Sequence, residues 1–159
     1  MGGKSAQMQI WIDGDACPAT VKDILFKAAE RIGVVVTLVA NRPMRVPSLH
    51  CISFIQVAAG LDAADNEIVK RLQGGDLVIT GDIPLAAKVI DKGGLALNPR
   101  GEMYCNDTIK SRLSERNFMD SLRASGIDTG GPAPLSKTDR QKFANQLDRL
   151  LTQHMQKLA

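Results

Sequence analysis

Short apolar runs alternate with amphipathic stretches over the first 97 residues. The apolar runs at residues 8–12, 34–40, 49–57, 76–80 and 95–97 are predicted to be strands. Between them, apolar residues recur at helical spacing in residues 18–32, 62–72 and 84–92, and glycines at 33, 74–75 and 93–94 end these segments. This alternation predicts an α/β fold in which helices cover both faces of a mostly parallel sheet of about five strands.

The alternation ends at Asn98. Residues 106–124 are helical in propensity, and residues 126–134 are rich in Gly and Pro. Ser136 and Asp139 form a capping-box-like start for a last helix, in which Phe143 and Leu147 share one apolar face. We therefore predict an α/β domain over residues 1–128, a linker over 129–135 and a C-terminal helical tail over 136–159. That tail packs either on its own domain or on a partner, which would allow a homodimer.

Composition limits the class of protein. The chain has 159 residues, 44% hydrophobic and 23% charged, as expected for a soluble domain. No apolar run approaches the roughly 18 residues of a membrane span, and the first residues lack a secretory signal, so we expect a cytoplasmic protein with no membrane partner. The three cysteines include no CxxC pair, which argues against disulfides and zinc.

Charge gives only a weak indication of a partner. The net charge is +3, with ten basic and seven acidic residues over 100–159 against ten of each before. This excess could contact a polyanion such as RNA, although a solvated surface is the favoured interpretation, because +3 is far from the charge of a typical DNA-binding module. Aromatic residues make up 4% of the chain, which argues against a surface on which bases stack.

Acidic residues follow two of the predicted strands directly. Asp13 and Asp15 come after the first strand, and Asp82 comes after the fourth. In an open parallel sheet, ligands bind beyond the carboxyl ends of the strands, where the strand order reverses. If these strands are neighbours there, the three carboxylates converge in one crevice. As turn or cap residues, the same aspartates would need no ligand.

Two further acids, Asp62 and Asp65, begin the helix before the fourth strand. They stand at positions i and i+3 and so share a helical face, although Asp62 could be only an N-cap and Asp65 only a complement to the helix dipole. Because gathered carboxylates repel one another, a cation is the simplest partner, and oxygen ligands select Mg²⁺ or Mn²⁺. One or two ions are expected, about 4 Å apart if both bind. His50 and His154 are isolated.

A cysteine and three arginines are further candidates for a role beside these acids. Cys17 precedes Pro18 at a predicted helix start, where a thiolate would be stabilised, but small-residue packing is the simpler interpretation. Arg42, Arg45 and Arg100 lie in loops that follow strands and could hold a phosphate.

Several segments together resemble a known family. They are Trp11-Ile-Asp13-Gly-Asp15-Ala-Cys17-Pro18, Ala64-Asp65-Asn66-Glu67-Ile68, Val78-Ile-Thr80-Gly-Asp82-Ile-Pro84 and Leu97-Asn98-Pro99-Arg100-Gly101. The chain resembles the YaiI/YqxD family of bacterial proteins over nearly its whole length from Met8. That family is grouped with PIN-like domains, which implies a three-layer α/β fold that often carries a metal-dependent ribonuclease.

The resemblance to PIN-like nucleases also implies roles for particular residues. Their first-strand aspartate matches Asp13, with Asp15 two residues on, and their helical acid matches Asp62 or Asp65. Their Thr/Ser-x-Asp motif matches Thr80-Gly-Asp82, whereas Asn98 stands where a further acid is expected.

The resulting hypothesis is a nuclease that hydrolyses RNA phosphodiesters with water activated by Mg²⁺ or Mn²⁺. The expected catalytic and metal-binding residues are Asp13, Asp15, Asp62, Asp65 and Asp82. Asn41, Arg45 and Arg100 would hold substrate, and Thr80 and Asn66 would support the ligands.

Two alternatives stay open: a non-catalytic RNA- or protein-binding module on the same fold, and a phosphatase of the haloacid dehalogenase type. Asp13-Gly-Asp15 resembles the nucleophile and acid pair of the latter. Cys17 replaces its expected threonine, and Ala86 stands where its second acid is expected.

Overall fold

Five parallel strands form one central sheet in the order β3-β2-β1-β4-β5. The computed structural model describes residues 8–60, 62–126 and 135–158, with side chains up to residue 154. The strands are β1 (Gln9–Asp13), β2 (Val35–Ala40), β3 (Ile52–Gln56), β4 (Leu77–Ile79) and β5 (Leu95–Leu97). The helices are α1 (Ala19–Ile32), α2 (Ala63–Arg71), α3 (Ile83–Asp91), α4 (Asn106–Ala124) and α5 (Lys137–Leu158). The predicted α/β fold is confirmed.

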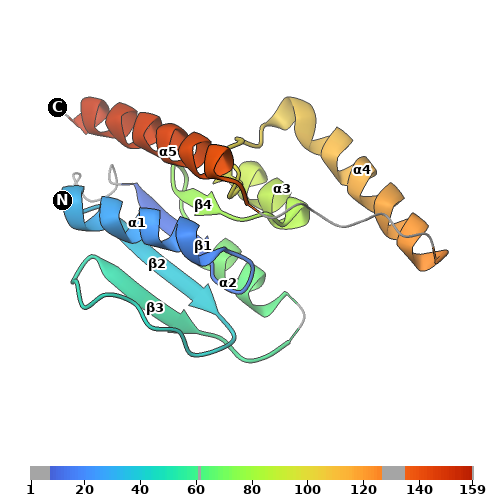
Figure 1. The fold of residues 1–159 in the computed structure, drawn as a ribbon, viewed down its shortest axis with the longest axis horizontal. Coiled ribbons are helices and arrows are strands. Elements are labelled where there is room, and N and C mark those ends of the chain that lie inside the picture. Colours follow the sequence, from blue (N-terminus) through green and yellow to red (C-terminus); the bar gives the residue numbers. More distant parts are fainter. Residues whose placement is uncertain (1–7, 61, 127–134, 159) are drawn as a thin grey trace.

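Helices cover both faces of this sheet (Figure 1). Neighbouring side chains of a strand point to opposite faces, and β1 shows the consequence. Ile10 and Ile12 pack in a core with α1 and α5, whereas Trp11 packs in a second core with α2 and α3. Both cores consist of buried, mostly aliphatic side chains, so β1 is enclosed between two helical layers.

Several element boundaries differ from the prediction. β1 extends to Asp13, because Asp13 pairs in register with Val39 of β2. β3 begins at Ile52, three residues late, because the Ile52 N–H bonds to the Leu49 carbonyl in a turn. β4 lacks the predicted end residues Asp76 and Thr80, β2 and α1 each begin one residue late, and α3 is shifted by one residue toward the N-terminus.

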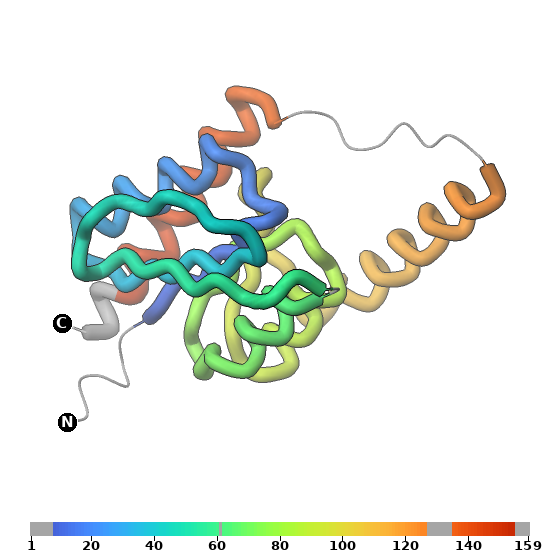
Figure 2. The backbone as a smooth tube through the Cα atoms, turned by 90° about the horizontal axis from the view of Figure 1, so that it is seen from below, coloured from blue at the N-terminus to red at the C-terminus, as the bar shows by residue number. Residues whose placement is uncertain are grey.

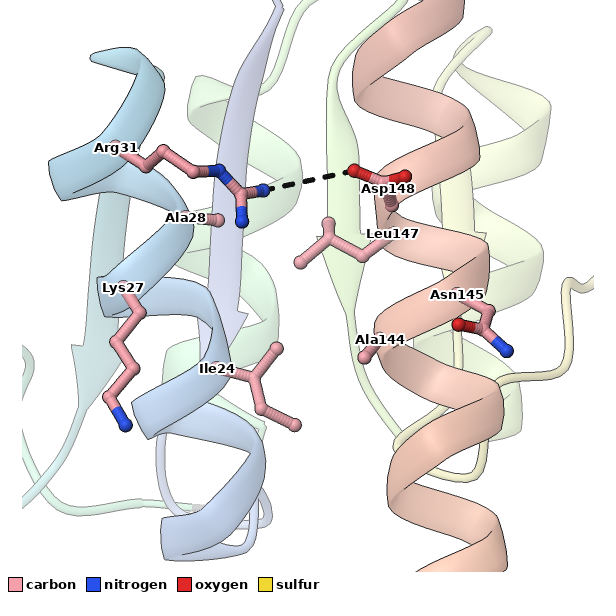
Figure 3. A pocket seen from close by; sticks show the side chains of 8 residues that line it. All are labelled: Ile24, Lys27, Ala28, Arg31, Ala144, Asn145, Leu147 and Asp148. Atoms are coloured by element: carbon pink, nitrogen blue, oxygen red, sulfur yellow. Dashed lines mark ion pairs between the residues drawn. The ribbon is translucent and has the colours of Figure 1, made fainter.

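The C-terminal helix α5 packs on its own domain and lies beside α1 (Figure 3). Phe143, Leu147, Leu150 and Leu151 are buried in the core shared with α1. The predicted capping box is present: the Asp139 N–H donates to Ser136 Oγ, and the Ser136 N–H donates to Asp139 Oδ2, both at 3.0 Å. Apart from Leu135, the predicted linker over residues 129–135 lies outside the described residues.

The loop after β5 rests directly on α5. Gly101 has φ +90°, and a Cβ placed there would lie 2.6 Å from backbone atoms of Lys142 and Phe143. Arg100 also forms an ion pair with Asp139 of α5. The loop therefore joins the edge of the sheet to the last helix.

Helix α4 differs from the other helices in its packing. Ile109, near its start, is its one buried residue, and the helix contacts α3. Its outer half extends away from the rest of the described chain in both views (Figures 1 and 2). Phe118 on this half is 61% exposed.

Candidate metal centre

The strand order reverses between β1 and β4, at the centre of the sheet. β1 pairs with β2 on one side and with β4 on the other, and Ile12 lies opposite Ile79. Asp13 follows Ile12 and Thr80 follows Ile79, so these two residues lie level with each other. Both are at the carboxyl edge of the sheet, toward which the strand arrows point (Figure 1). This is the position at which open α/β sheets bind ligands.

Thr80 connects the acid of β1 to the acid that follows β4. Its hydroxyl donates to Asp13 Oδ2 at 3.2 Å and accepts from the Asp82 N–H at 3.0 Å. Asp13 is 5% exposed and Thr80 is 1% exposed. The hydroxyl thus links the Asp13 carboxylate to the backbone of Asp82.

Asp82 has two roles at this edge. As the N-cap of α3, its Oδ1 accepts from the Leu85 N–H at 3.1 Å. Its carboxylate also joins Asp62 and Asp65, because one carboxylate oxygen from each of the three lies within 4.8 Å of the others. Asp82 is therefore the N-cap of α3, as predicted, and also a member of the acid cluster.

Asp62 and Asp65 reach this cluster from α2. Asp62 stands at the N-cap position with φ 62°, and its side chain makes no capping bond. Among the described residues, Asp62 is the one non-glycine residue with positive φ. The expectation that Asp62 caps the helix is therefore wrong, because its left-handed backbone leaves the carboxylate facing Asp65 and Asp82 instead.

Burial and neighbouring carboxylates raise the pKa values of Asp13 and Asp65. Burial raises the pKa of Asp65 to about 7, with further contributions from the carboxylates of Asp82 and Asp13 and from a hydrogen bond with Asp82. Burial raises the pKa of Asp13 to about 6, partly opposed by the Thr80 hydrogen bond and assisted by Asp82 and Asp15. The charges acting on both groups are all negative, so the site lacks a positive charge.

No side chain of the described residues supplies that charge. Asp13, Asp62, Asp65 and Asp82 take part in none of the ion pairs found there. The donor set consists of carboxylate oxygens and the Thr80 hydroxyl, which suits a hard divalent cation such as Mg²⁺ or Mn²⁺. The residues present therefore fit such an ion.

The other predicted site residues lie around the cluster. Asp15 is exposed, and its Oδ2 accepts from the Asn41 N–H at 3.0 Å, which ties the segment after β1 to the end of β2. Arg42 and Arg45 are exposed in the loop after β2, and Asn66 is exposed on α2. Arg100 is engaged by Asp139 of α5.

Cys17 does not behave as an activated thiol. It is 8% exposed, and its thiol donates to the Pro18 carbonyl. Burial raises its pKa to about 12, with Lys22 opposing the shift and Asp13 adding to it. The suggestion of a stabilised thiolate is therefore wrong, and the packing interpretation holds.

Tyr104 lies on the β5 side of the crevice and was not found from the sequence. Its N–H donates to the Ala96 carbonyl at 3.0 Å, and its ring lies under the Arg112 guanidinium, 5.2 Å from the centroid. Burial raises the pKa of Tyr104, Arg112 opposes this shift, and Glu102 and Asp82 add to it. Helical spacing predicts α4 but not that Arg112 would stack on Tyr104.

The chain belongs to the YaiI/YqxD family. It matches the family described as "Uncharacterized BCR, YaiI/YqxD family" over residues 11–153. A UPF0178 protein of Syntrophotalea carbinolica is 70% identical over 93% of this chain and 100% of its own length. UPF0178 proteins of Hydrogenovibrio crunogenus and Halorhodospira halophila are 63% and 65% identical, over 92% and 91% of this chain and 97% and 95% of theirs.

No solved structure matches this chain. Within the described residues, no helix is both long enough and apolar enough to cross a membrane.

Proposed function

We propose that this protein is a metal-dependent nuclease that hydrolyses RNA phosphodiesters. One observation carries the proposal: one carboxylate oxygen from each of Asp62, Asp65 and Asp82 lies within 4.8 Å of the others at the switch point of the sheet. Asp13 is close enough for its charge to act on Asp65, and no ion pair of the described residues neutralises these acids. The resemblance to PIN-like nucleases, in which acids at these positions hold metal, adds the substrate class.

In this proposal Asp13, Asp65 and Asp82 hold Mg²⁺ or Mn²⁺. When bound, the ion lowers the pKa of a water molecule and stabilises the charge that develops on the leaving oxygen. Thr80 keeps Asp13 and Asp82 in place through its two hydrogen bonds. Asp62 and Asp15, the two exposed acids, orient water or hold a second ion at the rim.

The loop residues contribute to substrate binding. Arg45 is exposed after β2 and would contact backbone phosphates, and the neighbouring Asn41 keeps Asp15 in place through its N–H. Arg100 would help to hold substrate by keeping the loop after β5 in place through its ion pair with Asp139.

The test is cleavage of single-stranded or structured RNA in the presence of Mn²⁺ or Mg²⁺. Asp13→Asn keeps the size of the side chain but removes a ligand charge, and we expect cleavage to fall on the order of a hundredfold or more, since even outer-shell changes cost 10–100-fold. Asp91→Asn is the control, because Asp91 is an exposed acid at the far end of α3. Binding of Mn²⁺, followed by calorimetry, should weaken in parallel with cleavage.

Other outcomes would replace the proposal. RNA affinity that neither chelator nor Asp13→Asn changes, with no cleavage, would indicate a non-catalytic binding module. Hydrolysis of small phosphomonoesters with an aspartyl-phosphate trapped on Asp13 would indicate a phosphatase.

A further inference from the structure

Two cationic side chains lie beside opposite ends of the sheet edge that carries the acid cluster, one against the loop after β2 and one against the segment after β5. Neither was expected from the sequence to have a role. Lys22 lies in the first turn of α1, on the β2 side, and Arg112 lies on α4, on the β5 side. Strands β1 and β4 separate the two; β1 ends at Asp13, and Asp82 follows β4 as the N-cap of α3.

Lys22 is held at the carboxyl edge by its position in the chain. Its N–H donates to the Pro18 carbonyl at 3.1 Å, and its Nζ donates to Met44 Sδ at 3.6 Å in the loop after β2. Lys22 and Asp13 act on the Cys17 thiol with opposite effects on its pKa, so Cys17 lies within range of both. The ammonium is in no ion pair among the described residues, and a thioether is a weak acceptor.

Arg112 is held on the other side by two contacts. Its guanidinium lies over the Tyr104 ring, 5.2 Å from the centroid, and its Nη2 lies 3.0 Å from Glu102 Oε2. The side chain is 30% exposed, and a guanidinium has five donors, so the pair with Glu102 leaves donors for another acceptor. Stacking on Tyr104 fixes the orientation of the planar Arg112 guanidinium.

The acids between these two cations impose a requirement on any polyanionic substrate. A phosphodiester strand that reaches Asp13, Asp65 and Asp82 brings its neighbouring phosphates toward a negatively charged crevice. Positive charge on each side of the crevice offsets that repulsion and keeps the strand across the edge of the sheet.

We propose that Lys22 and Arg112 bind the phosphates on either side of the phosphodiester at the acid cluster. The inference rests on the proposed function and deepens it: the substrate is an internal phosphodiester of a polynucleotide, with anionic neighbours on both sides. A dinucleotide or a phosphomonoester lacks these neighbours and gains nothing from the two cations.

The test measures binding separately from cleavage. In the Asp13→Asn background with Mg²⁺ present, fluorescence anisotropy of a labelled single-stranded RNA gives the Kd over a series of salt concentrations. We expect Lys22→Ala and Arg112→Ala each to raise the Kd roughly three- to tenfold and to reduce the slope of log K against log salt by about 0.7. In the background that retains Asp13, KM for the RNA should rise, with little change for a dinucleotide.

Matched controls come from the other face of α1. Lys27 and Arg31 lie beside the groove between α1 and α5, away from the acid cluster, and pair with Asp23 and Asp148 (Figure 3). Lys27→Ala and Arg31→Ala remove the same charges and should leave the salt slope unchanged. Arg112→Lys keeps the charge and should recover most of the slope, which separates a lost phosphate contact from a disturbed Tyr104.

Failure of this inference is distinguishable from failure of the proposed function. If the protein cleaves RNA and the Lys22 and Arg112 variants bind it with unchanged Kd and salt slope, the flanking sites are wrong and the nuclease stands. If the protein with Asp13 intact neither binds nor cleaves RNA, both are wrong. If it binds RNA without cleavage and both variants lose salt slope, the flanking sites stand and the nuclease is wrong.

Discussion

Buried carboxylates lie at both ends of this sheet, in opposite chemical situations. Asp76, at the start of β4, is 3% exposed and accepts hydrogen bonds from the Gln9 N–H, Trp11 Nε1 and the Gln73 N–H at 3.2, 3.1 and 2.9 Å. At the other end, Asp13 and Asp65 face further carboxylates and the hydroxyl of Thr80. Asp76 is satisfied by its own chain, whereas the carboxyl-edge cluster requires a cation or protons.

Structural acids and candidate site acids differ in their hydrogen-bond and charge partners. Burial alone does not distinguish them, because Asp76 is as deeply buried as Asp13. The partners do: N–H donors surround one acid and carboxylates surround the other. Substitutions should therefore have opposite effects on stability at the two ends.

The largest expected effect on folding is at the amino end of the sheet. Asp76→Ala leaves the indole N–H of Trp11 and two backbone N–H groups without their acceptor, and we expect a loss of about 2–4 kcal/mol in the free energy of unfolding. Urea denaturation measures it, with the exposed Asp91→Ala as control. A loss no larger than that of the control would contradict the structural role of Asp76.

Next comes Thr80, which belongs to the carboxyl end. Thr80→Val keeps the shape of the side chain but removes the hydroxyl that bonds to Asp13 and to the Asp82 N–H. We expect Mn²⁺ affinity to fall about 10–100-fold, as for other residues that orient metal ligands. Calorimetric titration tests this, and Thr80→Ser, which retains the hydroxyl, should bind nearly as the unmodified protein does. Equal affinity in Thr80→Val would show that the hydroxyl does not position the ligands.

A smaller effect is the pH dependence of stability in the metal-free protein. The pKa of Asp13 is about 6 and that of Asp65 about 7, against an ordinary value of 3.8. Between these values the folded state holds more protons than the unfolded state, so stability falls as the pH rises from near 4 to near 7. We expect a loss of about 2 kcal/mol from the two acids after allowing for solvent screening.

Urea denaturation at several pH values, with chelator present, measures this loss. Saturating Mn²⁺ should make the free energy of unfolding depend less on pH, because the cation replaces the protons that the acids release. Stability that rises through this window would be evidence against a cluster that lacks positive charge.

The smallest effect is a gain in stability. Asp65→Asn removes one charge from the cluster, and we expect the metal-free protein to gain about 1 kcal/mol at pH 7. The gain should disappear at pH 4, where Asp65 is protonated, and in the presence of Mn²⁺. Destabilisation at pH 7 instead would mean that Asp65 is a structural acid like Asp76.

Much of the fold could be predicted because it follows from local patterns. The alternation of apolar runs and glycine-ended helices gave the parallel sheet, and the position of Asp13 and Asp82 after two strands indicated that they would meet. That Asp62 and Asp65 both reach the cluster could not be predicted, because helical spacing does not indicate that Asp62 has a left-handed backbone and makes no capping bond.

Contacts between segments far apart in the chain could not be predicted from the sequence. Arg100 was expected to hold phosphate, but its partner Asp139 lies 39 residues away on a helix whose packing was undecided. Lys22 and Arg112 have no local motif, and their positions follow from how α1 and α4 dock. A side chain's partner, unlike its secondary structure, depends on the whole fold.

The packing of α5 has a consequence for the order of events during synthesis. Phe143, Leu147, Leu150 and Leu151 complete the core on one face of the sheet. Until the ribosome has produced these four residues, that apolar face lacks its cover, so the nascent domain cannot reach its native state before residues 143–151 have been synthesised. A polypeptide released before these residues are made would be an intermediate with exposed apolar surface, prone to capture by chaperones or to aggregation.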